Sequence, residues 1–216
     1  MTPISKLAFS APTKHGSRCA LALASLLVVS FAHGQTATPK AEAPQIKVGD
    51  YWKQEQKDKR TGSRESETSR TVSAVTQTAI EGTENDGKFS MTPELNPVES
   101  TSTLVTGEPR FLNFPLEVGK RWSFKYNFSN KTNQNKGRVQ LDAEVVAYEK
   151  VTVAAGSFDA FRIETKGYWN NDATRGNGRS KSTYWYAPTA RTVVRTDYDD
   201  GYNNWTRELI EYRLQP

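Results

Sequence analysis

Residues 122–128 read Trp-Ser-Phe-Lys-Tyr-Asn-Phe, with an aromatic side chain at every second position. In an extended strand successive side chains point to opposite faces, so the aromatic rings share one face and the polar groups share the other. Each buried ring removes about 150–250 Å² of surface from water. The stretch therefore predicts a β-strand with one face in the hydrophobic core and the other in solvent.

The same two-residue period continues along the second half of the chain. Strand-like runs rich in aromatic and β-branched residues occur at 145–153, 161–163, 183–186, 192–198 and 205–214. The segments between them are polar or glycine-containing, as hairpin turns require, at 130–137, 154–157, 170–178 and 199–201. No window of helical length shows a convincing apolar stripe with helical spacing. We predict an all-β fold, a single-domain antiparallel curved sheet, roll or sandwich of about ten strands.

Two parts of this domain differ sharply in composition. Three aromatic residues occur between residues 35 and 110, whereas eighteen occur between residues 111 and 216. Weak, polar alternation at 50–60, 64–76 and 99–106 indicates further strands in the first part. We expect residues 48–216 to form one β domain, with a polar, aromatic-poor half at 48–110 and most of the core in an aromatic-rich half at 111–216.

Residues 1–34 have the features of a cleaved signal peptide. A basic stretch at 14–18 precedes an apolar run at 19–32, which is shorter than the about twenty residues of a membrane span. Small residues at 32 and 34 predict cleavage before Gln35. Residues 35–47 contain two prolines and open with small, polar side chains, so we expect a flexible spacer there. The protein is thus predicted to be periplasmic or secreted, with no membrane span in the mature chain.

Both histidines and the single cysteine lie in this leader, at His15, His33 and Cys19. A mature chain without these residue types has no disulfide, no His or Cys metal ligand, no serine–histidine triad and no cysteine nucleophile. The leader also holds three basic residues and no acidic one, so its removal lowers the formal net charge from +5 to +2. We expect no catalytic residue, no cofactor, no metal site and no binding to nucleic acid.

One aromatic group is a candidate ligand-binding site, formed by Trp169, Trp185, Tyr186, Tyr202 and Trp205 with asparagines beside it. Aromatic faces next to amides suit a sugar or a base, because the ring gives apolar contact and the amide fixes hydroxyl groups. The alternative interpretation is core packing, since neighbours in sequence point to opposite faces of a strand.

Three groups of charged residues have both a functional and a structural interpretation. Asp197, Asp199 and Asp200 fit a calcium loop poorly and a hairpin turn better. Asp142 and Glu144 share one strand face, either as part of a glycosidase acid pair or as a solvated face. A basic group either attracts an acidic polymer or pairs with aspartates on neighbouring strands; it comprises Arg175, Arg179, Lys181, Arg191 and Arg195.

Three phrases of the second half occur in an order that is typical of one bacterial family. They are FPLEVGKRW at 114–122, YEKVTVAAGSFDAFRI at 148–163 and YWYAP at 184–188. In these phrases the chain resembles the TapB-like family, uncharacterised exported proteins with a periplasmic domain of unknown function. Ala154 stands where that family has proline, and residues 189–191 replace its usual continuation. The resemblance implies an all-β exported domain with no catalytic residue to carry over.

These observations together predict a non-catalytic envelope protein that binds a partner or a small ligand. The partner is expected to be another envelope protein, or a ligand of the glycan or lipid class. Two other functions stay open. A carboxylate-based glycan hydrolase requires two acids facing each other across a cleft, about 5–9.5 Å apart. A carrier of a lipid or another hydrophobic ligand requires an apolar cavity inside the β structure.

Overall fold

The aromatic stretch at 122–128 lies in strand β9 (Arg121–Asn130), which pairs antiparallel with β10 (Lys136–Val153). Across this ladder Phe124 lies opposite Leu141, and both side chains are buried. Ser123 and Lys125, on the alternate positions, are exposed. The predicted strand and its two-faced character are confirmed.

The structure is a computed structural model that describes residues 39–133 and 135–216. The predicted signal peptide at 1–34 and residues 35–38 of the predicted spacer lie outside the described residues. One short 3₁₀ turn, η1 (Pro188–Ala190), accompanies the strands. The remaining strands are β1 (Lys40–Ala41), β2 (Tyr51–Asp58), β3 (Arg64–Val75), β4 (Ile80–Glu84), β5 (Gly87–Met91), β6 (Pro97–Glu99), β7 (Thr103–Glu108), β8 (Leu116–Glu117), β11 (Gly156–Asn171), β12 (Asn177–Ala187), β13 (Thr192–Asp199) and β14 (Asn204–Arg213).

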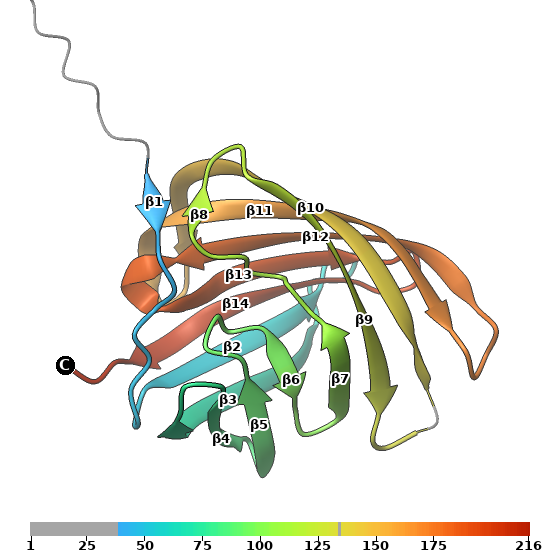
Figure 1. Ribbon diagram of the computed structural model, residues 1–216, viewed down its shortest axis with the longest axis horizontal. Helices are drawn as coiled ribbons and strands as arrows, with labels where there is room; N and C mark the ends of the chain where they lie inside the picture. Colours follow the sequence, from blue (N-terminus) through green and yellow to red (C-terminus); the bar gives the residue numbers. More distant parts are fainter. Residues whose placement is uncertain (1–38, 134) are drawn as a thin grey trace, which may run out of the picture. The chain divides into compact units, whose positions relative to one another are not determined.

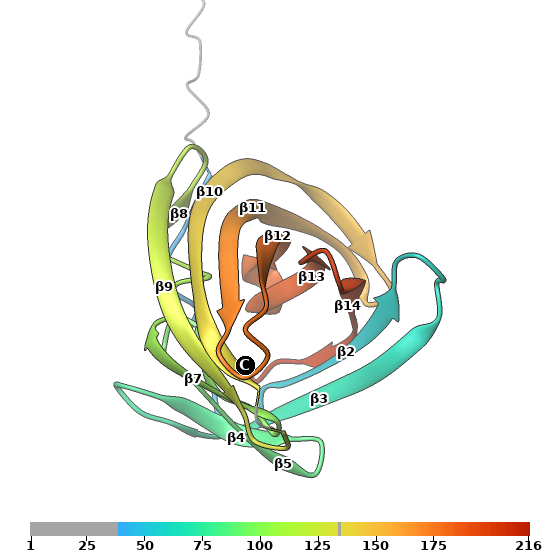
Figure 2. The ribbon, with the colours of Figure 1, turned by 90° about the vertical axis from the view of Figure 1, so that its right-hand side faces the viewer.

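In the described part of the chain, twelve strands form one closed barrel in the order β10-β11-β12-β13-β14-β2-β3-β4-β5-β6-β7-β9. Neighbouring strands are antiparallel, and they follow one another around a common interior (Figure 1, Figure 2). The predicted all-β antiparallel fold is therefore confirmed. The prediction of a curved sheet, roll or sandwich of about ten strands is wrong, because twelve strands close into a barrel.

Two pairings between strands that are distant or non-consecutive in sequence close the barrel. β14 pairs with β2, from Trp205 opposite Asp58 to Arg213 opposite Tyr51, and β7 pairs with β9. Closure gives each barrel strand a neighbour on both sides. Alternation along one strand shows which residues share a face but not which distant strand lies beside it. The sequence pattern therefore does not distinguish a closed barrel from an open sheet.

Residues 39–47, the described part of the predicted spacer, pack against the rest of the domain. Strand β1 pairs with β8, which places Lys40 opposite Glu117 and Ala41 opposite Leu116 (Figure 1). The side chains of Ala41 and Ile46 are buried. These residues differ from a flexible spacer because their apolar side chains find buried positions and their backbone finds a partner strand.

Two hydrophobic clusters form the core. The first joins both halves of the chain, since Trp52, Val72, Ile80 and Phe89 pack with residues of the second half such as Leu209. The second cluster comes from the aromatic-rich half, apart from one residue of β1. Closure of the barrel explains the mixed cluster, because it brings β2 and its neighbours beside β14.

The connection between β7 and β8 enters the interior of the barrel. The ring centroid of Phe111 lies 5.2 Å from that of Tyr126 and 5.8 Å from that of Tyr184. The buried side chain of Asn96 fastens this connection, because its amide donates to the Leu112 carbonyl at 2.8 Å and accepts from the Leu112 N–H at 2.9 Å. The chain itself thus fills part of the interior, and the remaining space is smaller than the barrel.

The close approach of strands at Gly167 on β11 generates a prediction about stability. A Cβ atom at this position would lie 2.0 Å from the backbone oxygen of Gln140. We expect Gly167→Ala to lower the free energy of unfolding in urea by about 1–3 kcal/mol. Gly176→Ala is the matched control, because its Cβ first meets the movable hydroxyl of Thr174 at 3.1 Å. Equal stability of the two variants would contradict the described strand packing.

Candidate ligand-binding cavity

A cavity of about 350 Å³ remains in the interior of the barrel. Residues of β2, β3, β12, β13 and β14 line it, together with Tyr126 of β9 and the inserted residues Phe111 and Leu112. Its volume is at the small end of the about 300–1,000 Å³ that ligand pockets enclose. Three larger hollows, of about 560, 850 and 930 Å³, follow the outer face of the β7–β12 region and include exposed groups such as Arg138 and Lys166.

Aromatic rings supply much of the cavity surface. We call this set the aromatic wall: Trp52, Phe111, Tyr126, Tyr184, Tyr198 and Trp205. The rings of Tyr198 and Trp205 stack with centroids 4.9 Å apart and an angle of 16° between their planes. Such a wall offers apolar contact area at little conformational cost, because aromatic side chains have few rotatable bonds.

Burial determines the protonation of the tyrosines in the aromatic wall. It raises the pKa of Tyr126, Tyr184 and Tyr198 above the ordinary value of 10.0. These hydroxyl groups therefore stay neutral near pH 7 and present a dipole to the cavity instead of a charge. The Tyr198 hydroxyl donates a hydrogen bond to Oδ2 of Asp200 at 3.0 Å.

Arg207 of β14 lines the cavity between two inward-facing apolar residues of the same strand, Trp205 and Leu209. Its Nη2 donates to Oε1 of Gln56 at 2.5 Å, and its guanidinium carbon lies 5.0 Å from the centroid of the Trp205 ring. Its Nε is buried and has no hydrogen-bond partner. Among the described residues, no carboxylate forms an ion pair with it at 4.0 Å or less.

The electrostatics of Arg207 follow from this position. Burial lowers the pKa of its guanidinium to about 10, and the positive charge of Arg70 adds to the effect. The group still carries its charge near pH 7. A buried charge without a counter-ion costs free energy, so the position of this side chain destabilises the unliganded fold.

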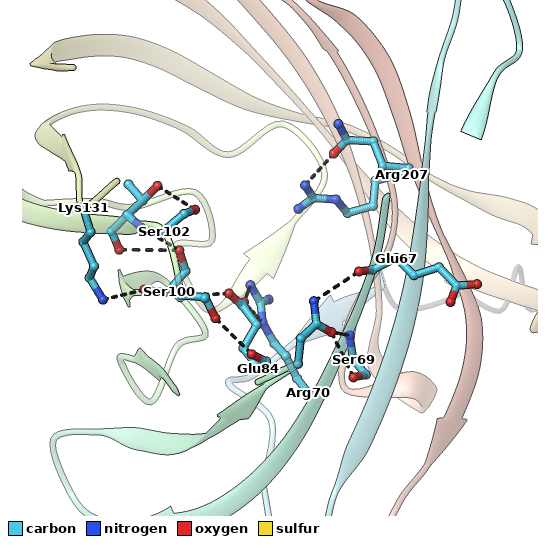
Figure 3. Close-up of polar contacts among 12 residues, drawn as sticks. Glu67, Ser69, Arg70, Glu84, Ser100, Ser102, Lys131 and Arg207 are labelled. Carbon is cyan, nitrogen blue, oxygen red and sulfur yellow. Dashed lines mark hydrogen bonds and ion pairs between the residues drawn. The ribbon is translucent and has the colours of Figure 1, made fainter. Parts of the chain in front are cut away.

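The other two arginines of the cavity each have a carboxylate partner. Arg70 donates from Nε to Oε2 of Glu84 at 2.7 Å (Figure 3). Nη1 of Arg191 donates to Oδ2 of the fully buried Asp50 at 3.2 Å. Only the charge of Arg207 is left unmatched within the part of the cavity that the structure describes.

The five residues of the sequence-based candidate site do not share one place. Trp205 lines the cavity, and Tyr186 lies in the core with 1% of its surface exposed. Trp169 and Tyr202 lie near each other, with ring centroids 5.8 Å apart, and Tyr202 is 69% exposed. Trp185 lies on the outer side of β12, where its indole N–H donates to the Glu149 carboxylate of β10 at 2.9 Å. The structure thus brings one of the five to the cavity.

Arg207 and Arg70 are cavity residues that the sequence interpretation missed. A signal for Arg207 was present, because Trp205, Arg207 and Leu209 alternate and so share the inner face of a strand. A charged residue between two large apolar ones on an inner face marks a polar position in a core. For Arg70 no such signal exists, since β3 is polar on both faces.

The acidic groups singled out in the sequence lie elsewhere. Asp142 and Glu144 on β10 bind a serine and an arginine of β9, each at 2.7 Å. Asp199 and Asp200 accept backbone N–H groups of the turn before β14, as a hairpin turn requires. Within residues 39–133 and 135–216, no group of three or more His, Cys, Asp or Glu side chains is placed to hold a metal ion.

Comparison with known proteins shows the fold. No protein-family model matches the chain, and no curated protein matches it. A solved structure of a Parabacteroides distasonis protein assigned as a lipoprotein is similar, with a TM-score of 0.56 and 17% sequence identity over 80% of this chain and 99% of that one. A Bacteroides fragilis protein assigned as exported, with a YmcC-like fold, has a TM-score of 0.57 and 13% identity over the same shares.

These similarities define the class of fold to which the chain belongs. The protein has a YmcC-like fold, built as a closed antiparallel barrel. The resemblance to the TapB-like family stays a prediction, since no family model matches. Across the described ranges, none of the helical structure has the length and apolar character needed to cross a membrane.

The Glu84–Arg70 pair generates a prediction about pH. Burial alone would raise the pKa of Glu84, but Arg70 and the hydrogen bonds from Thr101 outweigh it and hold the pKa below the ordinary 4.5. A carboxylate of this kind stabilises the fold above its unfolded-state pKa, and that contribution is lost as the pH falls through the folded-state pKa. We expect Glu84→Gln to lower the free energy of unfolding by about 1.5–3 kcal/mol at neutral pH.

The difference between Glu84→Gln and the unsubstituted protein should shrink as the pH falls below 4.5 and through the lowered pKa of folded Glu84, where the carboxyl becomes protonated in both the unfolded and the folded chain. Urea unfolding at a series of pH values measures this difference. Glu81→Gln, on the exposed face of the same strand, is the control. A Glu84→Gln deficit that stays constant across this pH range would refute the role of the charged pair.

Proposed function

We propose that the protein is a non-catalytic, exported protein of the cell envelope that binds a small ligand inside its barrel. The observation that carries this proposal is the interior cavity, which combines the aromatic wall with an arginine that has no carboxylate partner among the described residues. A closed, partly filled barrel with a few polar groups on an apolar surface is the usual construction of a small-molecule site.

The envelope location is supported by two observations. Residues 1–34 have the pattern of a signal peptide. The proteins of the two similar solved structures are assigned as a lipoprotein and as an exported protein. Periplasmic or secreted location after cleavage of the leader, and membership of the TapB-like family, are parts of the same proposal.

The non-catalytic character is supported by the state of the acids at the cavity. Glu84 is paired with Arg70, Asp50 with Arg191, and Glu99 with a lysine of the loop after β9 at 2.6 Å. For Glu84, Arg70 and Thr101 hold the pKa below its ordinary value, which makes this carboxylate a poor general acid. Among the functions left open by the sequence, the carrier of a hydrophobic ligand fits the aromatic wall better than glycan binding or hydrolysis does.

A neutral fluorescent probe tests the proposal. We expect 1-aminoanthracene to bind saturably, with one molecule per chain, and to transfer energy from Trp205. Thr196→Phe, which places a ring in the cavity, should weaken binding at least about tenfold, because overpacking a filled site costs about 1–3 kcal/mol. Fluorescence titration measures the number of probe molecules bound per chain and the affinity of each variant for the probe.

Thr83→Phe is the matched control, since Thr83 lies on the exposed face of β4. It should bind the probe as the unsubstituted protein does. Urea unfolding of each variant establishes that it is folded, and Thr68→Phe on β3 offers a second position in the cavity lining. Absence of saturable binding, or equal binding by the Thr196 and Thr83 variants, would overturn the interior site.

A further inference from the structure

We propose that the cavity takes a small organic acid, whose carboxylate meets Arg207 and whose apolar body lies along the aromatic wall. This inference rests on the proposed interior site and adds the chemical class of its ligand. It depends on three features of the cavity: an arginine with unused donors, an excess of positive charge, and an apolar surface of limited volume.

The donors of Arg207 point to an anionic acceptor. A guanidinium has five N–H donors, and the structure engages one nitrogen, Nη2, with the neutral amide oxygen of Gln56. Nη1 donates to none of the described residues, whereas Nε is buried beyond the reach of solvent. A carboxylate accepts two parallel hydrogen bonds from a guanidinium and neutralises its charge, which a hydroxyl or an amide cannot do. An acid ligand would therefore satisfy the group that the protein itself leaves unsatisfied.

The charge balance of the cavity selects an anion over a cation. Three arginines line it, and two of them are matched by Glu84 and Asp50. Among the described residues, Glu99 is the carboxylate in the lining itself, and it is bound by Lys131 at 2.6 Å. One positive charge is thus left over in a low-dielectric space, where an opposite charge is attracted more strongly than at the surface.

The surface and volume of the cavity limit the rest of the ligand. The guanidinium of Arg207 lies over Trp205, which stacks on Tyr198, so an apolar group next to the carboxylate meets aromatic rings at once. The amide of Gln54 is occupied, since it donates to the Val193 carbonyl at 2.9 Å. A cavity of about 350 Å³ suits a single chain or a single ring system and not a lipid with two acyl chains.

Competition experiments with matched acids and alcohols test this assignment. Decanoate and decan-1-ol form one pair, and 2-naphthoate and 2-naphthol form the other, so the two arms separate a chain acid from an aromatic acid. Each compound is titrated against 1-aminoanthracene bound to the unsubstituted protein and to Arg207→Met. The measured quantity is the fold-loss of affinity caused by the substitution, compared between acid and alcohol.

We expect Arg207→Met to weaken at least one acid about tenfold or more while its alcohol changes by about twofold or less, because a charged hydrogen bond is lost only with the acid. The midpoint of urea unfolding should stay unchanged or rise, since methionine replaces an uncompensated buried charge. Arg207→Lys keeps the positive charge but loses the paired N–H donors of the guanidinium. Its affinity for the acid should therefore lie between that of the unsubstituted protein and that of Arg207→Met. Arg195→Gln, on the outer side of β13 in ion pairs with Asp197 and Glu208, should behave as the unsubstituted protein.

The outcomes separate the two proposals. Equal losses for acid and alcohol in both pairs, or no displacement by either acid, would overturn the acid assignment while probe binding still supports the interior site. Failure of 1-aminoanthracene to bind, together with no heat in a calorimetric titration of decanoate and 2-naphthoate, would overturn both. If Arg207→Met does not fold, the same comparison with Arg207→Lys decides the matter.

Discussion

The pairing of β14 with β2 is the constraint on which the rest of this structure depends. It joins the C-terminal strand to the first long strand of the domain and, with the pairing of β7 and β9, turns a sheet into a barrel. Closure gives each barrel strand a neighbour on both sides, with one inner and one outer face. It also places the aromatic-poor strands beside the aromatic-rich ones, so that both halves share a core.

Polar groups inside a closed barrel are removed from water, so the stability of the fold depends on whether each of them finds a partner in the protein. Asp50 and Glu84 are almost fully shielded, and each is stabilised by an arginine and by backbone N–H donors. Arg207 is the contrasting case, because its only hydrogen bond is to a neutral amide and its charge has no carboxylate partner among the described residues. An unsatisfied buried polar group in a native structure requires an explanation, and the proposal explains that of Arg207 by a ligand that completes its hydrogen bonds.

How much of this was predictable from the sequence can be seen at particular residues. The strand at 122–128 was predictable, because alternation is a local property that one strand displays alone. Closure of the barrel was not predictable, because β2 carries polar residues on both faces and nothing in its sequence identifies β14 as its neighbour. The stacking of Trp205 on Tyr198 follows from the β13–β14 pairing, which places the two residues opposite each other. Trp185 and Tyr186 are adjacent in sequence but pack against different hydrophobic clusters. The alternation of Trp205, Arg207 and Leu209 predicts that Arg207 lies on the inner face of its strand. That this face borders a cavity follows only from the closure of the barrel.

The central claim, that the barrel interior holds a small acid against Arg207, is tested most directly by native mass spectrometry of the mature protein purified gently from its own host. The account predicts one additional mass on the unsubstituted chain, whose fragmentation identifies a carboxylic acid, and a strongly reduced proportion of that mass on Arg207→Met. A bare chain mass in both proteins, or an equal proportion of the same added mass on both, would contradict it.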